Sequence, residues 1–354
     1  MLYQMENQHG GDVYGGGITL DFSANTNPLG TPPGVLEAVC RALPQLHRYS
    51  DPYCRRLVQA IAGHEQVPAS YILCGNGAAD LIYTYCAALR PRTAVEPAPT
   101  FAEYGLGLAQ VGCRVTPYFL HQAENFDVDE GFLPFLEEKK PEVVFLCNPN
   151  NPTGRLLPLP LLEWILQGCA AWGARVFLDE CFLDLTEDGV SAKALLAAHP
   201  ELLILKAFTK SYGMAGIRLG YCLCADSALL HRMASASQPW NVSSLAQSAG
   251  VAALTEQGFL RRTRELIRTE RRWLTDNLTA LGFWVCPSQA NYLLFRGPRG
   301  LREGLLRQGI VIRSCGNYSG LDDGWYRIAV RPHEENEALI TAIRQFCKEK
   351  SLWL

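Results

Sequence analysis

The sequence predicts an α/β fold built on a doubly wound sheet of mostly parallel strands. Short apolar runs alternate with longer segments of helical periodicity through the middle of the chain, and most of these runs are apolar at every position. Strands covered by helices on both faces have this composition, because neither face meets water. With 354 residues, 48% of them hydrophobic and 19% charged, the chain is long enough for a large globular domain and a smaller one.

Seven apolar runs are expected to form the large sheet, with helices between them. After residue 240 the sequence becomes more charged, which indicates one long helix and then a smaller α/β unit. The expected strands of the large sheet are 71–74, 93–96, 114–120, 143–147, 175–178, 202–207 and 219–224, and the helices between them include 78–89, 101–111 and 159–172. Beyond them we expect a helix over 243–281, strands at 290–295, 311–314 and 326–330, and helices at 301–308 and 334–348.

These elements divide the chain into three expected parts. Residues 1–35 are rich in glycine and proline, and we expect them to form an arm that packs on the active site and the small domain. Residues 36–240 would form the large domain, and residues 241–354 the small C-terminal domain.

Composition narrows the class of protein. The net charge of −3 gives no reason to expect a nucleic-acid partner. No apolar run approaches the roughly 18 residues that cross a membrane, and the first residues lack the pattern of a signal peptide. The thirteen cysteines are scattered without a C-x-x-C pair, so we expect no metal site but reduced thiols in a cytoplasmic protein.

Residues with distinct chemistry follow the expected strands, at the edge where parallel sheets bind ligands. Asp179 follows the run 175–178, and Lys210 lies just beyond the run 202–207. Gly75-Asn76-Gly77 precedes an expected helix, whose first backbone N–H groups suit a phosphate.

Further motifs complete a recognisable set. The stiff turn NPNNPTG at 148–154 presents asparagine side chains, while Thr209 and Arg218 place a hydroxyl and a forked cation near Lys210. A lysine amine, a carboxylate for a pyridine nitrogen and a phosphate cradle are what pyridoxal 5'-phosphate requires. Each motif alone is also compatible with an ordinary turn, helix cap or ion pair, so the prediction depends on their occurrence together.

On the blocks NPNNPTG, LDE, TKSY and GIRLGY, the sequence resembles the pyridoxal-phosphate enzymes of the aspartate-aminotransferase fold (type I). The resemblance covers about residues 9–348 and is to the branch that holds histidinol-phosphate aminotransferases and threonine-phosphate decarboxylases. It implies a mostly parallel seven-stranded sheet in the large domain, a smaller α/β domain, and a homodimer whose active sites are shared between subunits.

The resemblance also implies roles for individual residues. Lys210 would form the Schiff base and move protons, Asp179 would pair with the pyridine nitrogen, and Asn151 would bind the ring hydroxyl. Phe101 would stack on the ring, and Tyr49 would reach the cofactor phosphate of the neighbouring subunit. The residues that would hold the cofactor phosphate within the subunit are Gly75, Asn76, Gly77, Thr209 and Arg218.

Blocks near both ends of the chain resemble the decarboxylase branch: HGG at 9–11, DFSANTNPLG at 21–30 and IRSCGNYSGL at 312–321. The implied reaction is decarboxylation of L-threonine O-3-phosphate to (R)-1-amino-2-propanol O-2-phosphate for cobalamin biosynthesis. Transamination of histidinol phosphate stays open because the sequence does not show how a substrate is rotated, and decarboxylation of L-serine O-phosphate stays open because that substrate differs by only one methyl group. A non-catalytic binding role is disfavoured, because Lys210, Asp179, Asn151 and Arg218 are all present. The implied substrate contacts are His9, Gly10, Asn25, Asn151, Arg313 and Arg327.

Overall fold

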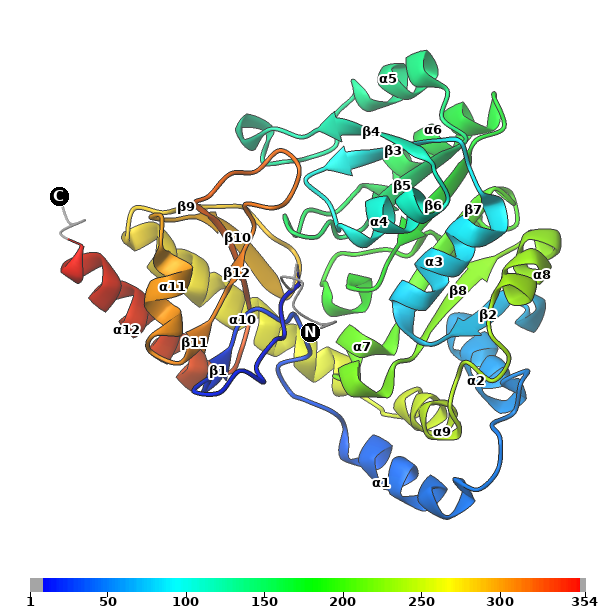
Figure 1. The fold of residues 1–354 in the computed structure, drawn as a ribbon, viewed down its shortest axis with the longest axis horizontal. Helices are drawn as coiled ribbons and strands as arrows, with labels where there is room; N and C mark the ends of the chain where they lie inside the picture. Colours follow the sequence, from blue (N-terminus) through cyan, green and yellow to red (C-terminus); the bar gives the residue numbers. More distant parts are fainter. Residues whose placement is uncertain (1–8, 351–354) are drawn as a thin grey trace.

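The computed structural model describes residues 9–350, which are organised around a large sheet and a smaller C-terminal sheet (Figure 1). All seven expected runs of the large sheet form strands, with boundaries shifted by at most a few residues. These strands are β2 (Ile72–Gly75), β3 (Thr93–Ala98), β4 (Arg114–Phe119), β5 (Val143–Cys147), β6 (Arg175–Asp179), β7 (Leu202–Ala207) and β8 (Gly220–Cys224).

The large sheet is mostly parallel, as predicted. Its strand order is β2-β8-β7-β6-β5-β3-β4. The neighbours from β7 to β4 pair in parallel, whereas β8 is antiparallel to both β2 and β7. The carboxyl ends of the adjacent parallel strands therefore meet at one edge, and the residues that follow them are brought together there.

Alternate residues of the central strands face two separate cores, which is why most positions on these strands are apolar. On β5, Val144 and Leu146 face one core, while Val143 and Phe145 face the other. The first core is covered by α1 (Pro33–Ala42), α2 (Arg55–Glu65), α5 (Phe132–Lys139), α6 (Leu159–Ala170), α7 (Phe208–Ser211) and α9 (Ser244–Ala253). The second is covered by α3 (Gly77–Leu89), α4 (Glu103–Gln110) and α8 (Ser227–Ala236).

The C-terminal sheet has four strands in the order β12-β13-β10-β9, all paired antiparallel. The N-terminal segment joins this part of the molecule, because β1 (Leu20–Asp21) pairs in parallel with β11 (Ile310–Val311) and Phe22 is buried in the same core. The other elements here are β9 (Trp284–Val285), β10 (Tyr292–Arg296), β12 (Arg313–Ser314), β13 (Trp325–Ala329), α10 (Phe259–Ala280), α11 (Leu301–Leu306) and α12 (His333–Glu349).

One predicted helix and one predicted strand are each divided into two elements in the structure. The helix expected over 243–281 is two helices, α9 and α10, separated by a turn in which Gly258 has a φ of +69°. A residue in the left-handed region interrupts an α-helix. The strand expected at 311–314 is divided between β11, which pairs with β1, and β12, which pairs with β13. In the described part of the chain, no helix is both long and apolar enough to cross a membrane.

Candidate active site

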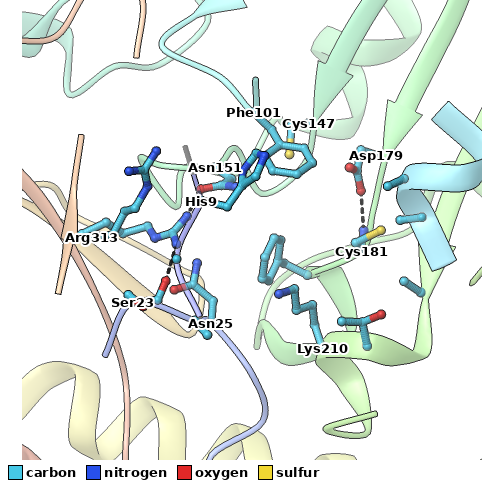
Figure 2. A pocket seen from close by; sticks show the side chains of 18 of the residues that line it. His9, Ser23, Asn25, Phe101, Cys147, Asn151, Asp179, Cys181, Lys210 and Arg313 are labelled. Atoms are coloured by element: carbon cyan, nitrogen blue, oxygen red, sulfur yellow. Dashed lines mark hydrogen bonds between the residues drawn. The ribbon is translucent and has the colours of Figure 1, made fainter. Parts of the chain in front are cut away.

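A cavity of about 220 Å³ lies at the carboxyl ends of the parallel strands, lined by the N-terminal segment, the large sheet and the C-terminal sheet (Figure 2). Most of the predicted site residues meet there although they come from distant parts of the sequence. Those that line the cavity are His9, Gly10, Asn25, Phe101, Asn151, Asp179, Thr209, Lys210, Arg218, Arg313 and Arg327.

Lys210 lies on α7, directly after β7, and points into the cavity. Its Nζ lies 5.6 Å from the centre of the Phe182 ring. Loss of hydration, together with the nearby positive charges of Arg327 and Arg218, lowers the pKa of Lys210 to about 8. About a tenth of this amine is therefore neutral at pH 7, far more than for an ordinary lysine, and a nucleophile or a proton acceptor must be neutral.

Asp179 ends β6 and is 5% exposed. One carboxylate oxygen accepts a hydrogen bond from the Tyr104 hydroxyl at 2.7 Å, and the other accepts from the Cys181 backbone N–H at 2.8 Å. Burial raises the pKa of Asp179, and these hydrogen bonds oppose that effect. The carboxylate is thus fixed in direction and forms no ion pair within residues 9–350, so a protonated ring nitrogen would suit it.

The residues predicted to hold the cofactor phosphate lie around the first turn of α3. Gly77 has a φ of +86°, and a Cβ added there would lie 2.6 Å from the Arg218 guanidinium. Arg218 therefore lies against the start of this helix, where only glycine leaves room for it. Gly75, Asn76 and Gly77 stand just behind the lining residues Ala78 and Ala79, and the Asn76 N–H already donates to the Asp80 carboxylate at 2.8 Å.

A second group of cations faces the cavity from the C-terminal sheet. Arg327, on β13, is 6% exposed and donates to the Asn151 side-chain oxygen at 2.5 Å and to the Ser23 carbonyl at 2.8 Å. Arg313 donates to Asn317 at 2.8 Å and lies over the Tyr318 ring. Within residues 9–350, neither side-chain polar atom of Asn25 has a hydrogen-bond partner, and the same is true of the Arg327 Nε.

Tyr49 does not reach this cavity. Its side chain is 82% exposed and stacks on Trp240, with ring centres 4.6 Å apart. The role predicted for Tyr49 is in a neighbouring subunit, so it stays a prediction.

Several residues of the site were missed in the sequence. Tyr104 holds Asp179, Ser23 holds Arg327, and the thiols of Cys147 and Cys181 line the cavity. Cys147 ends a predicted strand and Cys181 comes three residues after another, which is a usable signal, whereas nothing local indicates the contact between Tyr104 and Asp179. In residues 9–350 no three His, Cys, Asp or Glu side chains are grouped so that they could hold a metal ion.

Comparison with known proteins decides the family. The family model for class I and II aminotransferases matches residues 18–343. The chain belongs to this family. The threonine-phosphate decarboxylase of Salmonella typhimurium is 41% identical to it over 329 residues, which span 92% of this chain and 90% of that protein.

Solved structures of family members have the same fold. The L-threonine-O-3-phosphate decarboxylase of Porphyromonas gingivalis has a TM-score of 0.83 and 26% identity, covering 93% of this chain and all of the other (100%). The histidinol-phosphate aminotransferase of Clostridium acetobutylicum has a TM-score of 0.87 and 27% identity, covering 94% and 100%. The predicted fold is confirmed. Because a decarboxylase and an aminotransferase both share this fold, the fold alone does not separate their reactions.

Proposed function

We propose that this chain is a pyridoxal-phosphate-dependent decarboxylase that converts L-threonine O-3-phosphate to (R)-1-amino-2-propanol O-2-phosphate for cobalamin biosynthesis. The observation that carries the proposal is the cavity in which Arg313 and Arg327 face the same space as Lys210 and Asp179. A phosphorylated amino acid has two anionic groups, and each needs a cationic partner. The 41% identity with the Salmonella decarboxylase supports this choice.

The residues of the site fit pyridoxal phosphate. Lys210 supplies the amine, Asp179 the carboxylate for the ring nitrogen, and Thr209, Arg218 and the start of α3 the phosphate site. The close approach of Arg218 to Gly77 supports the last assignment, because it brings a forked cation onto a helix N-terminus. When bound, the cofactor accepts the electron pair of the bond that breaks at the substrate α-carbon.

The protein's own residues then select that bond. Because its guanidinium is held by Asn151 and Ser23, Arg327 is a fixed fork that can orient the substrate carboxylate. Loss of CO₂ breaks the bond from the α-carbon to the carboxylate and leaves an electron pair at the α-carbon. Lys210 Nζ, with its lowered pKa, is the group that delivers a proton to that carbon. Asp179 keeps the proton on the ring nitrogen, which favours acceptance of the electron pair.

The proposal includes a homodimer with shared sites. Large apolar side chains are exposed around α1 and the segment that follows it, and Tyr49 lies in this segment. A second copy of the chain would remove this surface from water. The exposed side chains are Leu36, Leu43, Leu46, Tyr49, Tyr53 and Trp240.

A cytoplasmic location and the three-part domain division also belong to the proposal. All thirteen cysteines are free thiols, and all except Cys40 and Cys113 are buried, which suits a reducing compartment. The division at residues 35 and 240 is supported by the two sheets, whose strands run from Ile72 to Cys224 and from Trp284 to Ala329.

One assay separates decarboxylation from transamination. The enzyme loaded with pyridoxal phosphate is incubated with threonine phosphate, serine phosphate or histidinol phosphate, each with and without 2-oxoglutarate, while CO₂ release and amino-group transfer are measured. We expect CO₂ from threonine phosphate without any acceptor, and weaker release from serine phosphate, because one methyl group discriminates by only about 1–3 kcal/mol. Acceptor-dependent transfer from histidinol phosphate, without CO₂ from threonine phosphate, would refute the proposal.

A further inference from the structure

At the cavity, the N-terminal segment contacts helix α4 through a histidine and a glutamate. His9 Nε2 and Glu103 Oε1 lie 2.7 Å apart. His9 lines the cavity, whereas Glu103 is the first residue of α4 and stands behind it. We propose that Glu103 is a positioning residue for substrate binding, which acts by holding the His9 ring and the N-terminal segment across the cavity. This inference rests on the proposed function of the site.

Glu103 is itself rigidly held. Its side chain is 12% exposed, and its second carboxylate oxygen accepts a hydrogen bond from the Tyr83 hydroxyl at 2.8 Å. Its place in the first turn of α4 favours a negative charge. The hydrogen bond with His9, followed by that with Tyr83, lowers the pKa of Glu103 although partial burial opposes it. Glu103 is therefore an ionised, oriented acceptor before any substrate arrives.

The residues that follow His9 are fixed by Ser23. The Gly11 N–H donates to the Ser23 hydroxyl at 2.8 Å, and a Cβ added to Gly10 would collide with the Ser23 carbonyl oxygen. That same carbonyl accepts the hydrogen bond from Arg327. The segment is thus attached to Arg327 through Ser23 and to α4 through Glu103, and His9 and Gly10 line the cavity at these attachments.

The consequence for the substrate lies in the His9 ring. This ring lies beside Phe101, with ring centres 6.1 Å apart, and both line the cavity (Figure 2). An imidazole whose one nitrogen is held by a carboxylate has its ring plane and direction fixed. A pre-oriented contact binds more tightly because less freedom is lost on binding. The effect of Glu103 should therefore appear mainly in KM.

The first test is Glu103→Gln, which removes the charge at nearly constant shape. We expect KM for the phosphorylated substrate to rise roughly tenfold, with a smaller change in kcat, because the hydrogen bond from the His9 ring to a charged acceptor is weakened. The matched control is Glu201→Gln. Glu201 forms another partly buried pair with a histidine, His199, at 2.8 Å and away from the cavity. The control should leave KM unchanged, and an unchanged KM in Glu103→Gln would overturn the inference.

A double-mutant cycle tests whether Glu103 acts through His9. We expect His9→Gln to raise KM, and Glu103→Gln to add little in the His9→Gln background. A purely structural role of Glu103 would instead give additive effects, which would contradict the inference. If the unmodified enzyme releases no CO₂ from threonine phosphate, the proposed function fails, and the cycle is measured with histidinol phosphate and 2-oxoglutarate.

A last measurement needs neither cofactor nor turnover. Tyr14, in the same segment as His9, is 91% exposed and is a chymotrypsin site. We expect faster cleavage after Tyr14, followed by mass spectrometry, in cofactor-free Glu103→Gln than in the unmodified protein or Glu201→Gln. Equal cleavage rates in all three proteins would show that Glu103 does not hold the segment.

Discussion

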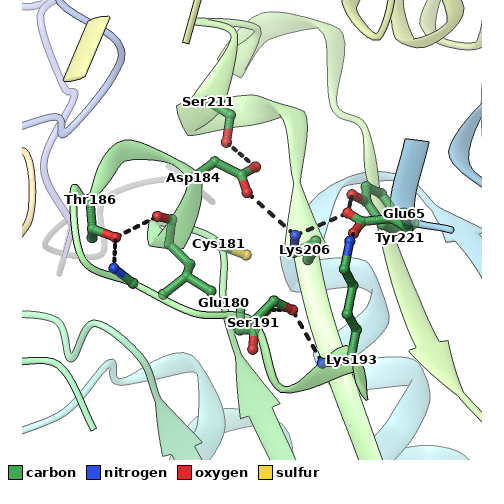
Figure 3. A network of polar contacts seen from close by, with 12 residues as sticks. Glu65, Glu180, Cys181, Asp184, Thr186, Ser191, Lys193, Lys206, Ser211 and Tyr221 are labelled. Carbon is green, nitrogen blue, oxygen red and sulfur yellow. Dashed lines mark hydrogen bonds and ion pairs between the residues drawn. The ribbon is translucent and has the colours of Figure 1, made fainter. Parts of the chain in front are cut away.

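Lys206 and Lys210 lie on one short segment of the chain in opposite environments (Figures 2 and 3). Lys206, on β7, donates to Glu65 at 3.0 Å and to Asp184 at 3.3 Å. Burial disfavours its charge, but the attraction of Asp184 and Glu65 is stronger and raises the pKa of Lys206. Lys210 Nζ makes no hydrogen bond within residues 9–350, and burial and nearby arginines lower its pKa to about 8.

The network around Lys206 is closed, because each carboxylate oxygen of Glu65 has a partner. Besides Lys206, Glu65 accepts hydrogen bonds from the Tyr221 hydroxyl at 2.5 Å and from Lys193 at 2.9 Å. Although burial opposes it, the charge of Lys206 and these hydrogen bonds lower the pKa of Glu65 to about 2. Through Asp184, which accepts from the Ser211 hydroxyl at 3.0 Å, the network also supports the helix that carries Lys210.

In the cavity, by contrast, several polar groups are not satisfied by other groups of the protein. The Asn25 amide and the Arg327 Nε have no partner within the described residues, and the only direct hydrogen bonds to the Asp179 carboxylate are from neutral donors. A buried polar group without a partner is unfavourable by about 1–3 kcal/mol, and a ligand in the cavity would supply partners for the Asn25 amide and the Arg327 Nε. The comparison teaches that the charges around Lys206 are satisfied within the protein, whereas polar groups of the cavity are left for a ligand.

The largest effect is expected in the cavity, at Lys210. Lys210→Ala removes the amine that binds the cofactor and moves the proton, so turnover should fall by at least about 10³-fold. The free energy of unfolding should not fall, because the substitution removes a buried amine that makes no hydrogen bond and therefore does not stabilise the fold. Turnover, the visible absorbance of lysine-bound pyridoxal phosphate and urea unfolding measure these outcomes. Substantial residual turnover would remove Lys210 from its assigned role.

The corresponding change in the network around Lys206 is Lys206→Met. It leaves Glu65 and Asp184 without their shared cation, so the free energy of unfolding should fall by about 3–5 kcal/mol in urea titrations. The double variant Glu65→Gln/Lys206→Met should recover part of this loss, because one of the unpaired charges is gone. A single variant as stable as the unmodified protein would show that the network does not stabilise the fold.

Replacement of either Arg313 or Arg327 should weaken the use of substrate and leave the cofactor bound. Arg327→Ala and Arg313→Ala each leave a substrate anion unpaired, and kcat/KM should fall by an amount equivalent to about 2–5 kcal/mol. Cofactor absorbance should persist, because Thr209 and Arg218 are unchanged. The exposed Arg299 gives the control Arg299→Ala, which should behave as the unmodified enzyme. Loss of cofactor in either cavity variant would mean that these arginines serve the cofactor instead.

Two aspartates, one in the cavity and one in the network around Lys206, give a direct test of the difference between these two regions. Asp179→Asn removes the charge that faces the cofactor, so turnover should fall by at least about 10²-fold with little loss of stability. Asp184→Asn weakens the contacts to Lys206 and Ser211, so stability should fall by about 1–3 kcal/mol with a smaller effect on turnover. If the two variants show the reverse pattern, the distinction drawn between the regions is wrong.

The strands of the large sheet were predictable because burial on both faces makes them apolar runs. Such runs can be identified in the local sequence without knowing which strands pair. Asp179 and Lys210 were predictable for a related reason, since each follows a buried strand. The division of the helix over 243–281 was missed because helical periodicity continues on both sides of Gly258.

Other residues could not be predicted because their roles depend on distant partners. Lys206 lies inside an apolar run, and its partner Glu65 is 141 positions away. Tyr104 and Asp179 are 75 positions apart, and Glu103 acquires its contact only when the N-terminal segment crosses the cavity. No local pattern records such pairs, so the sequence indicates which side chains can react but not which side chains orient them.

The smallest effect concerns the pH at which Lys210 becomes reactive. Only the neutral amine attacks the cofactor aldehyde, so the rate at which cofactor-free protein takes up pyridoxal phosphate should follow the neutral fraction of Lys210. With a pKa of about 8, this rate should rise roughly tenfold per pH unit below pH 8 and level off above it. In Arg327→Gln the midpoint should move to higher pH, because a neighbouring positive charge that disfavours the protonated amine is removed. The measurement is stopped-flow absorbance on the cofactor-free protein, with Arg299→Ala as the control. A midpoint near the ordinary lysine value in the unmodified protein would show that the cavity does not lower this pKa, and the contrast with Lys206 would then lose its electrostatic basis.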